Sequence, residues 1–463
     1  MLKNIFKSVY FFREYLSPVR LIVSSFLFVI LVGTVILSLP VCSRNGQSTN
    51  FVDSFFVSTS CTCVTGLTPF DTYTHWSTFG QVVMLILIQL GGLGPVSFTT
   101  GFALLIRKKL RFREFQIAQA YTRGNMIDIS KLLKTILFVS FLVESIGAIL
   151  LSFRFVPLWG LRGIWISIFL SISAYCNAGF DVLGFISPDI SLTLFKGDEF
   201  VSIIIASLII IGGLGFIVIV DIYSKLNEKI NHKNINSHIS INTKIVIITS
   251  SILLLIGTLM FLIFEYNNSL NGLGFIDKIT ASFFQSTTAR TAGYATIFVS
   301  DQLDITKIFI MILMFIGASP SSTGGGIKTT TVFVIFASVI SVLKGESDAI
   351  VNKHRLRKSV VYQSICITVL AMIIVIFTII ILEIVEGPNS ISSVDLMFEA
   401  VSAFGTVGLS SGITPLLSDI SKYALCFAMF VGRVGPMTLV ISLTLKLSNR
   451  TENILPEGKI VVG

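Results

Sequence analysis

A short polar loop that contains glycine recurs four times in this chain, and each copy interrupts sequence that is otherwise strongly apolar. The successive loop glycines, Gly66, Gly179, Gly293 and Gly408, lie 113, 114 and 115 residues apart. Lipid cannot satisfy bare N–H and C=O groups, so backbone that leaves the helix at membrane depth must be buried in protein or line a water-filled cavity. Ordinary surface turns use similar residues, but four copies at nearly constant spacing predict one pore lined by four loops.

The composition lies outside the range of soluble globular domains, because 53% of the residues are hydrophobic and only 13% are charged. Crossing a hydrocarbon core of about 30 Å takes roughly 20 helical residues. Eight apolar runs approach or exceed that length, at residues 21–39, 79–106, 132–153, 200–220, 245–264, 305–340, 360–384 and 423–445. We therefore predict an all-α, multi-pass protein of the plasma membrane.

The formal net charge of +9 is distributed as in a membrane protein, which argues against a nucleic acid partner. Lysine and arginine gather before the first apolar run, after the second, between the fourth and fifth, and between the sixth and seventh. These residues are Lys3, Lys7, Arg13, Arg20, Arg107, Lys108, Lys109, Arg111, Arg113, Lys225, Lys229, Lys233, Lys244, Lys353, Arg355, Arg357 and Lys358. Cytoplasmic segments carry such an excess of positive charge, so we expect both termini in the cytoplasm and the glycine loops facing outward. The last cluster would meet anionic membrane lipid or a cytoplasmic partner.

Each quarter of the chain combines a span, a half-helix, a polar loop and a second span. The half-helices, at about 51–60, 164–174, 277–285 and 395–404, are too short to cross a bilayer and are expected to re-enter from outside. Their negative dipole ends would point to the membrane centre, where they favour a cation. The predicted repeats are 1–117 with its pore loop at 51–67, 118–232 with 164–180, 233–352 with 275–294, and 353–463 with 393–409 and a C-terminal tail.

Glycine also marks the second spans, where it lets helices pack closely or unwind. Close packing is the expectation for the GGLG strings at 91–94 and 212–215. Residues 317–328 differ, because Gly, Ser and Pro together are too frequent there for a continuous helix. We predict that this third span breaks at mid-membrane, and that its poorly hydrogen-bonded backbone rearranges easily.

These residues resemble the Trk/Ktr/HKT superfamily of potassium uptake proteins. The resemblance rests on the fourfold repeat, on Ala-Arg-Thr-Ala-Gly at 289–293, on Ser-Pro-Ser-Ser-Thr-Gly-Gly-Gly-Ile-Lys at 319–328 and on the string at 432–437. It covers essentially the whole chain, and the string that ends at Lys328 is its most specific part. Because the sequence begins with the first repeat, it is most similar to the KtrB-type membrane subunit.

The resemblance implies channel-like potassium uptake and a potassium-channel-like fold with pseudo-four-fold symmetry around one central pore. Backbone carbonyls of the loops would bind the potassium ion. The filter residues are then Val64, Thr65, Gly66, Asn177, Ala178, Gly179, Thr291, Ala292, Gly293, Thr406, Val407 and Gly408. The first and fourth loops keep a TVG-like string and the other two do not, which suggests looser selectivity than in a symmetric channel. Glycine in all four loops favours potassium, since some plant relatives that carry sodium have serine there.

The resemblance also implies a gate below the filter. Its residues would be Gly317, Ser319, Pro320, Ser321, Ser322, Thr323, Gly324, Gly325, Gly326, Lys328 and Arg433. Family members work as homodimers on a cytoplasmic ring of KtrA-type regulatory subunits that bind ATP or ADP. Nucleotide is therefore expected only on the partner, no covalent cofactor is expected, and activation by sodium stays open.

Two other classes of function were weighed against a channel-like protein. A secondary transporter with broken helices, such as a TrkH-like proton or sodium symporter, is the alternative, although two long repeats would be more usual for it than four. An enzyme is disfavoured, because no HExxH, GxSxG or Cys–His pairing lies within a span.

Two arginines fall where an uncharged side chain is expected. Arg433 lies inside the eighth apolar run, so its charge should face the protein interior. It either opposes cation passage below the filter or forms a buried ion pair with an acid such as Glu144, which lies inside the third run. Arg290 is expected to brace the third loop by donating to carbonyls or to Glu399.

Three acids lie near the starts of the half-helices, namely Asp53, Asp277 and Asp395. Carboxylates at helix N-termini accept hydrogen bonds from free backbone N–H groups and interact favourably with the helix dipole. We therefore expect these residues to be N-caps and not ion ligands.

Overall fold

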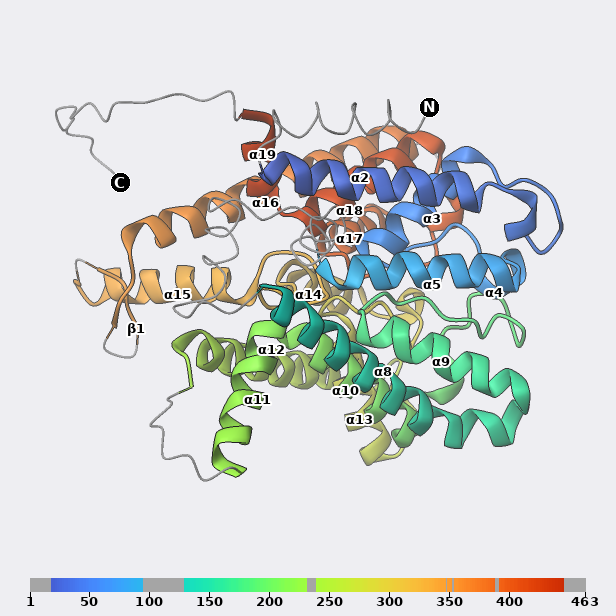
Figure 1. Ribbon diagram of the computed structural model, residues 1–463, viewed down its shortest axis with the longest axis horizontal. Helices are drawn as coiled ribbons and strands as arrows, with labels where there is room; N and C mark the ends of the chain where they lie inside the picture. Colours follow the sequence, from blue (N-terminus) through green and yellow to red (C-terminus); the bar gives the residue numbers. More distant parts are fainter. Residues whose placement is uncertain are drawn as a thin grey trace.

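Helices make up most of the described chain in the computed structural model (Figure 1). The structure describes residues 18–94, 129–230, 239–346, 348–351, 354–387 and 391–444. The predicted repeat starts at 118, 233 and 353 lie outside the described residues, as does part of the predicted positive charge. The basic residues concerned are Lys3, Lys7, Arg13, Arg107, Lys108, Lys109, Arg111, Arg113, Lys233 and Lys353.

Four long helices each begin a similar series of elements. They are α2 (Pro18–Leu37), α8 (Ile129–Trp159), α12 (Ile241–Glu265) and α16 (Lys358–Glu386). Each is followed by a shorter helix that ends at a glycine loop, which we call a loop helix. The loop helices are α3 (Phe51–Cys63), α9 (Leu161–Tyr175), α13 (Phe275–Thr288) and α17 (Ser393–Gly405).

After each glycine loop the chain enters a return helix. The return helices are α5 (Thr78–Gly92), α10 (Glu199–Leu214), α14 (Asp304–Phe315) and α18 (Asp419–Val434). Within the described residues, three of them continue in a further helix, α11 (Phe216–Ile230), α15 (Thr329–Leu343) and α19 (Pro436–Thr444). The short elements are η1 (Pro40–Cys42), α4 (Thr72–His75), η2 (Thr193–Phe195), η3 (Val299–Asp301), η5 (Thr414–Leu416) and the antiparallel hairpin of β1 (Ile350–Val351) and β2 (His354–Arg355).

The return helices break more often than the sequence predicted. The predicted break is present, because α14 ends at Phe315 and α15 begins at Thr329. In addition, α10 and α11 meet at an angle of 95° around Gly215, and α18 and α19 meet at 95° around Gly435. Both glycines have a φ near +90°, which residues with a Cβ rarely adopt. The sequence analysis predicted a break only in the third return span, so the bends around Gly215 and Gly435 are additional.

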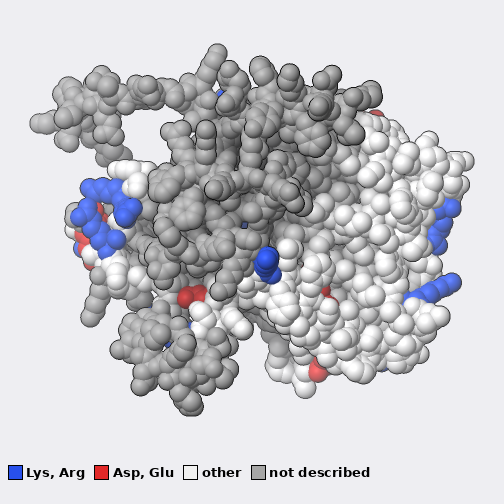
Figure 2. All heavy atoms as spheres, viewed as in Figure 1, with Lys and Arg blue, Asp and Glu red and all other residues white. Residues whose placement is uncertain are grey.

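Long apolar helices and exposed apolar side chains agree with a membrane protein. Three described helices, 134–159, 241–265 and 358–386, are long and apolar enough to cross a bilayer, and the number is five if each bent pair counts as one span. Large apolar side chains such as Phe138, Phe153 and Phe377 are exposed on their outer faces. In Figure 2 the right-hand part of the visible face is largely uncharged, with lysine or arginine at its right edge.

Each return helix packs against the loop helix of the next series. The contacting pairs are α5 with α9, α10 with α13, α14 with α17, and α18 with α3. The last pair closes the chain on itself, and Figure 1 accordingly shows the N-terminal α2 and α3 beside the C-terminal α16 to α19. One buried cluster joins the first two series around Trp76 and Phe169, and a second joins the last two around Phe398 and Phe404.

Glycines in the return helices allow this close approach. A Cβ atom at Gly91, Gly212 or Gly432 would collide with a backbone carbonyl at the end of a loop helix, namely Thr62 O, Tyr175 O or Phe404 O. The close packing predicted for the GGLG strings is therefore confirmed at Gly91 and Gly212. It brings the return helices up against the glycine loops.

Candidate functional site: a ring of four loops

The four glycine loops share one backbone pattern. A residue in the left-handed region comes first, and a glycine with positive φ follows two positions later. The pairs, with φ in degrees, are Val64 (58) and Gly66 (99), Asn177 (60) and Gly179 (71), Thr291 (76) and Gly293 (83), and Thr406 (51) and Gly408 (90). Non-glycine residues seldom adopt positive φ, so its occurrence at four corresponding positions reflects a common local structure.

The loops contact one another in sequence order and form a closed ring. A Cβ atom on each loop glycine would lie 2.6 Å or less from a carbonyl oxygen of the next loop. The four contacts are Gly66 with Ala178 O, Gly179 with Ala292 O, Gly293 with Val407 O, and Gly408 with Thr65 O. A side chain at any of these positions would therefore push two loops apart. The structure brings all twelve predicted filter residues together in this ring.

In the first and fourth loops a serine hydroxyl supports the glycine. Gly66 N donates to Ser60 Oγ at 3.0 Å, and Gly408 N donates to Ser402 Oγ at 3.1 Å. Each serine lies six residues before its glycine, inside the loop helix. These are the two loops with a TVG-like sequence.

In the second and third loops a serine or threonine hydroxyl of the loop helix acts as a hydrogen-bond donor instead. Ser173 Oγ donates to Phe180 O at 2.8 Å, and Thr288 Oγ1 donates to Tyr294 O at 2.7 Å. In both cases the acceptor follows the loop glycine. The difference in sequence between the two kinds of loop is thus matched by a difference in hydrogen bonding.

The second and third loops are also hydrogen-bonded to each other. Tyr294 Oη donates to Phe180 O at 3.1 Å. The Asn177 amide and the Thr291 hydroxyl lie 3.1 Å apart. No corresponding side-chain bond joins the first and fourth loops within the part of the chain that the structure describes.

One face of the ring opens into a cavity of about 260 Å³. All four loop glycines line it, together with Asp71, Asp181 and Asp189, and we call it the glycine-side vestibule. Burial, reinforced by the charges of Asp71 and Asp189, raises the pKa of Asp181 to about 7, although Leu183 N donates to its carboxylate. Burial and Asp71 also raise the pKa of Asp189. The cavity is therefore lined by carboxylates that attract cations.

The opposite face of the ring is covered by residues 316–328, which we call the crossing segment. Gly325 N donates to Thr406 Oγ1 at 2.9 Å. A Cβ atom at Gly324 would collide with Thr291 Oγ1. Both threonines precede the loop glycines, whereas the vestibule is lined by the glycines and the residues after them. The segment therefore lies on the side where the loop helices end.

Hydrogen bonds to other helices hold the crossing segment, so the prediction of a poorly hydrogen-bonded backbone was wrong. The bonds are Ser319 N to Gly213 O (3.1 Å), Thr323 N to Gly212 O (3.3 Å), Phe216 N to Ser321 O (2.9 Å) and Gly326 N to Gly432 O (3.2 Å). A Cβ atom at Gly215 would also collide with Pro320 O. The bends at Gly215 and Gly435 lie close to these contacts, because Phe216 N and Gly432 O take part in them.

Arg433 and Lys328 donate to carbonyls around the crossing segment. Arg433, which is 5% exposed, donates from Nη1 to Thr323 O and from Nη2 to Gly91 O. Its guanidinium thus joins the segment to the first return helix. Lys328 Nζ donates to Gly324 O at 2.7 Å and to Gly325 O at 3.3 Å. The Arg433 guanidinium therefore places a positive charge on the covered side of the ring, and the Lys328 amine lies on the same side.

The alternative ion pair between Arg433 and Glu144 is not formed. Glu144 instead accepts from Gln89 Nε2 at 2.9 Å and lies 3.9 Å from Cys176 Sγ. Carbonyls can satisfy a buried guanidinium without any carboxylate, because each N–H needs only an acceptor. A pattern of opposite charges in the sequence does not reveal such acceptors.

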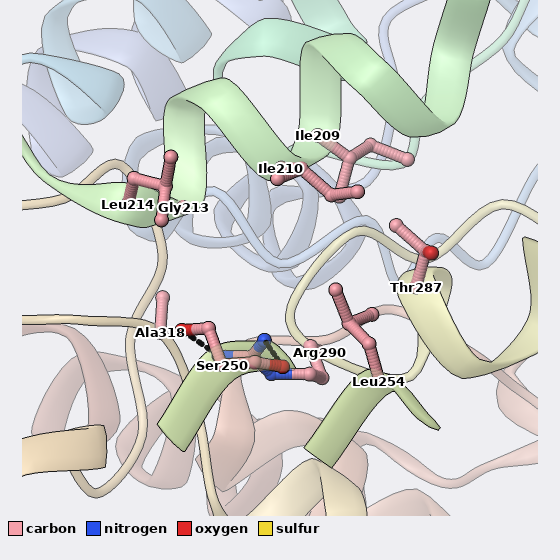
Figure 3. Close-up of a pocket in the computed structure, with 9 residues that line it drawn as sticks. All are labelled: Ile209, Ile210, Gly213, Leu214, Ser250, Leu254, Thr287, Arg290 and Ala318. Carbon is pink, nitrogen blue, oxygen red and sulfur yellow. Dashed lines mark hydrogen bonds between the residues drawn. The ribbon is translucent and has the colours of Figure 1, made fainter. Parts of the chain in front are cut away.

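Arg290 contacts a long helix and not the loop residues that follow it. Its Nη1 and Nη2 lie 3.3 Å from Ser250 O and Ser250 Oγ in α12. Figure 3 shows it at a cavity of about 20 Å³ between α10 and α12. Glu399 accepts from Thr414 Oγ1. Of the two predicted kinds of partner, a carbonyl is present, Ser250 O, whereas the alternative contact with Glu399 is not formed. The loop is thus braced indirectly, through α12.

The three acids are not N-caps. Asn50, Gly274 and Ser392 hold the cap positions of α3, α13 and α17. The acids Asp53, Asp277 and Asp395 lie in the first helical turns, where the dipole still favours them. Two of them form ion pairs with distant lysines, which the sequence analysis did not identify.

Comparisons with known proteins agree with this architecture. The family model for TrkH, a cation transport protein, matches residues 18–452. The potassium/sodium uptake protein NtpJ of Enterococcus hirae is 37% identical over 97% of this chain and 98% of its own length. The Ktr system potassium uptake protein B of Bacillus subtilis is 34% identical over 96% of this chain and 97% of its own length.

The crystal structure of the potassium transporter TrkH from Vibrio parahaemolyticus has a similar fold. Its TM-score is 0.68 at 19% sequence identity, with 94% of this chain and 86% of that chain covered. The relatedness in sequence is therefore accompanied by a similar arrangement of helices over nearly the whole length. Both findings confirm the resemblance that the loop and glycine motifs indicated.

Proposed function

Because the chain belongs to the TrkH family of cation transport proteins, we propose that it is the ion-translocating subunit of a potassium uptake system. As a member of this family it is a multi-pass membrane transport protein and not an enzyme. In the proposal, potassium moves through one pore with pseudo-four-fold symmetry. The ion binds to backbone carbonyls of the four loops as it passes.

The closed ring of glycine loops is the observation that carries this proposal. Carbonyl oxygens of four separate loops lie against the neighbouring glycines, with no side chain between them. Rings of carbonyls replace the hydration shell of a potassium ion in selectivity filters. The ends of the four loop helices approach the same ring, and the negative ends of helix dipoles favour a cation. Glycine at all four positions supports potassium as the preferred ion.

The crossing segment is proposed to be the gate. It covers the ring on the side away from the vestibule, and its residues 317–326 contact two loops and the return helices. Arg433 joins it to α5, whereas Lys328 donates to carbonyls within the segment, and the positive charge of Arg433 would oppose a cation in the proposed ion path. Transport would require the segment to move aside. Its bonds run to other helices and not within a helix of its own, so it can move without unwinding one.

The orientation and the partners complete the proposal. The vestibule and its carboxylates would face outward and the hairpin after α15 inward, with both termini in the cytoplasm. The name of the Bacillus subtilis relative refers to a Ktr system, which supports a homodimer on a cytoplasmic nucleotide-binding ring. The name of the Enterococcus hirae relative includes sodium, which supports sodium as an activating or second ion.

Ion uptake in a bacterial strain that lacks its own potassium uptake tests the proposal. Cells that express the chain with a Ktr-type regulatory subunit should take up Rb⁺ and K⁺, and excess Na⁺ should compete weakly. A channel-like protein should also carry Rb⁺ down its gradient in vesicles without a proton or sodium gradient. Uptake that vanishes without such a gradient would favour a symporter, and no uptake under any condition would refute the proposal.

A further inference from the structure

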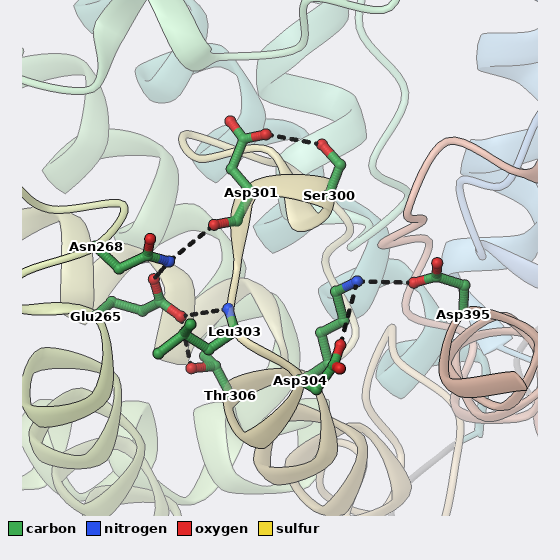
Figure 4. A network of polar contacts seen from close by, with 9 residues as sticks. Glu265, Asn268, Ser300, Asp301, Leu303, Asp304, Thr306 and Asp395 are labelled. Atoms are coloured by element: carbon green, nitrogen blue, oxygen red, sulfur yellow. Dashed lines mark hydrogen bonds and ion pairs between the residues drawn. The ribbon is translucent and has the colours of Figure 1, made fainter. Parts of the chain in front are cut away.

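Two buried ion pairs join return helices to the loop helices of the next series. Lys307 Nζ lies 2.9 Å from Asp395 Oδ1, and Lys422 Nζ lies 2.7 Å from Asp53 Oδ1. Both lysine side chains are at most 10% exposed. Figure 4 shows the first pair, with Asp395 reaching across from α17. Asp304 also lies near this lysine, but at 3.9 Å and largely exposed.

The pairs occupy corresponding positions in the two series. Each lysine is the fourth residue of its return helix, and each aspartate is the third residue of its loop helix. At the same positions the first return helix has Gln81, which accepts from Trp165 Nε1 at 2.8 Å, and the second has Ser202. Asp277, the third residue of α13, therefore faces no lysine of this kind and forms no ion pair among the described residues.

Buried glutamates hold the lysine-bearing helices from the other side. Glu265, at the end of α12, accepts from Leu303 N at 2.9 Å and from Thr306 Oγ1 at 2.6 Å, as Figure 4 shows. Glu386, at the end of α16, accepts from Ser418 N at 2.8 Å and from Ser421 Oγ at 2.6 Å. The N-termini of α14 and α18 are thus fixed, so their lysines provide fixed anchor points for the loop helices.

The ion-paired loop helices carry the two TVG-like loops. Asp53 and Asp395 belong to α3 and α17, which end at the first and fourth loops. The second and third loops are instead held by hydrogen bonds between each other, from Tyr294 to Phe180 and between Asn177 and Thr291. The first and fourth loops have no such bond between them in the described residues. The positions of their helices therefore contribute to their spacing in the ring, beside the bond from Gly325 N to Thr406 Oγ1 that holds the fourth loop.

We infer that the Lys307–Asp395 and Lys422–Asp53 pairs are positioning elements that set the spacing of the first and fourth loops, and thereby the discrimination between potassium and sodium. This inference rests on the proposed function. About ten helical residues, or roughly 15 Å, separate each aspartate from the end of its helix. A helix of that length that tilts by about 4° moves its loop end by roughly 1 Å. A shift of this size changes the distance of the carbonyls from an ion in the ring.

Neutral variants of the aspartates test the inference, and the third series provides a matched control. Asp53→Asn and Asp395→Asn should each increase inhibition of Rb⁺ uptake by Na⁺ by roughly three- to thirty-fold, the range for residues that act on a site through intervening contacts. Asp395→Glu, which can keep the ion pair, should stay close to wild type. Asp277→Asn changes the same residue type at the same helical position without breaking a pair, so it should leave Na⁺ inhibition unchanged.

Removing one partner leaves a buried charge, which can impair folding. All uptake is therefore measured per inserted protein, and the double variant Asp395→Asn with Lys307→Met removes both charges. The inference predicts lost selectivity in the double variant even when insertion is normal. Wild-type selectivity in that variant would overturn the inference and leave the proposed function intact. If the wild-type protein itself does not distinguish Rb⁺ from Na⁺, the proposed function fails, and the inference fails with it.

Discussion

Replacing Arg433 tests how the crossing segment is held closed. The guanidinium donates to Thr323 O in the segment and to Gly91 O in α5, and it is buried. Arg433→Ala removes both hydrogen bonds and the positive charge. The segment should then move aside more often, and a cation should meet a lower barrier on the covered side of the ring.

The size of the effect follows from two terms. A hydrogen bond from a charged donor contributes about 1.5–3 kcal/mol, part of which is lost again when the carbonyls stay unpaired. A net change of about 2 kcal/mol shifts the closed–open equilibrium roughly 30-fold. Removing a unit charge about 7 Å from the ion lowers the barrier by about 2 kcal/mol at an effective dielectric constant of about 20. We therefore expect the maximal uptake rate to rise about tenfold or more, because passage through the ring itself limits the gain.

The assay is Rb⁺ uptake against concentration, normalised to inserted protein. Arg433→Ala should raise the maximal rate with little change in half-saturation, since the ring is unaltered. Arg433→Lys keeps the charge but loses the forked geometry. If Arg433→Lys takes up Rb⁺ as fast as Arg433→Ala, the lost hydrogen bonds are the main cause of the faster uptake. If Arg433→Lys is as slow as wild type, the lost charge is the main cause. Equal or lower uptake in Arg433→Ala, at normal insertion, would refute the role of this residue in closing the pore.

Three further predictions concern the ring, the segment and the vestibule. Gly66→Ser should raise the half-saturation for Rb⁺ or admit Na⁺, because Gly66 has a φ of +99° and a Cβ there would lie 2.5 Å from Ala178 O. The control variant Gly46→Ser, at a φ of +66° in open space, should change neither property. Equal behaviour of the two variants would argue against the ring. Deleting residues 319–325 should raise the maximal uptake rate with little change in half-saturation, and wild-type flux in that variant would exclude a gating role. The Asp181 carboxylate, with its pKa raised to about 7, is charged above that pH and neutral below it. Lowering the external pH from about 8 to 6 should therefore raise the Rb⁺ half-saturation by roughly fivefold, which corresponds to about 1 kcal/mol of lost attraction. Asp181→Asn should abolish this pH dependence. If the variant keeps the wild-type pH profile, Asp181 is not the group responsible.

The sequence allowed the helices, the loops and one broken span to be predicted, because these features depend on local composition. Apolar runs require helices in lipid, and regularly spaced glycines mark positions where a Cβ is excluded. The bend at Gly215 was missed because the same GGLG string also contains Gly212, which does pack closely as predicted. One motif therefore serves two purposes, and its composition does not separate them.

The partners of the charged residues depend on contacts between distant parts of the chain. Asp53 was interpreted as a local cap, whereas its lysine lies 369 residues away in the sequence and is brought close only when the last return helix packs against the first loop helix. Arg433 was matched with an acid, although its acceptors are backbone carbonyls that no side-chain pattern reveals. The acidic positions could be identified from sequence, but the residues that neutralise them could not.

Locating a transported ion directly tests the central claim that the four loops form one binding ring. The measurement is anomalous diffraction from crystals of the protein grown with Rb⁺ in place of K⁺. The account predicts an anomalous peak on the axis of the ring, surrounded by carbonyl oxygens of all four loops, including Thr65, Ala178, Ala292 and Val407. A peak coordinated by only one or two loops, or rubidium bound between helices away from the ring, would contradict it.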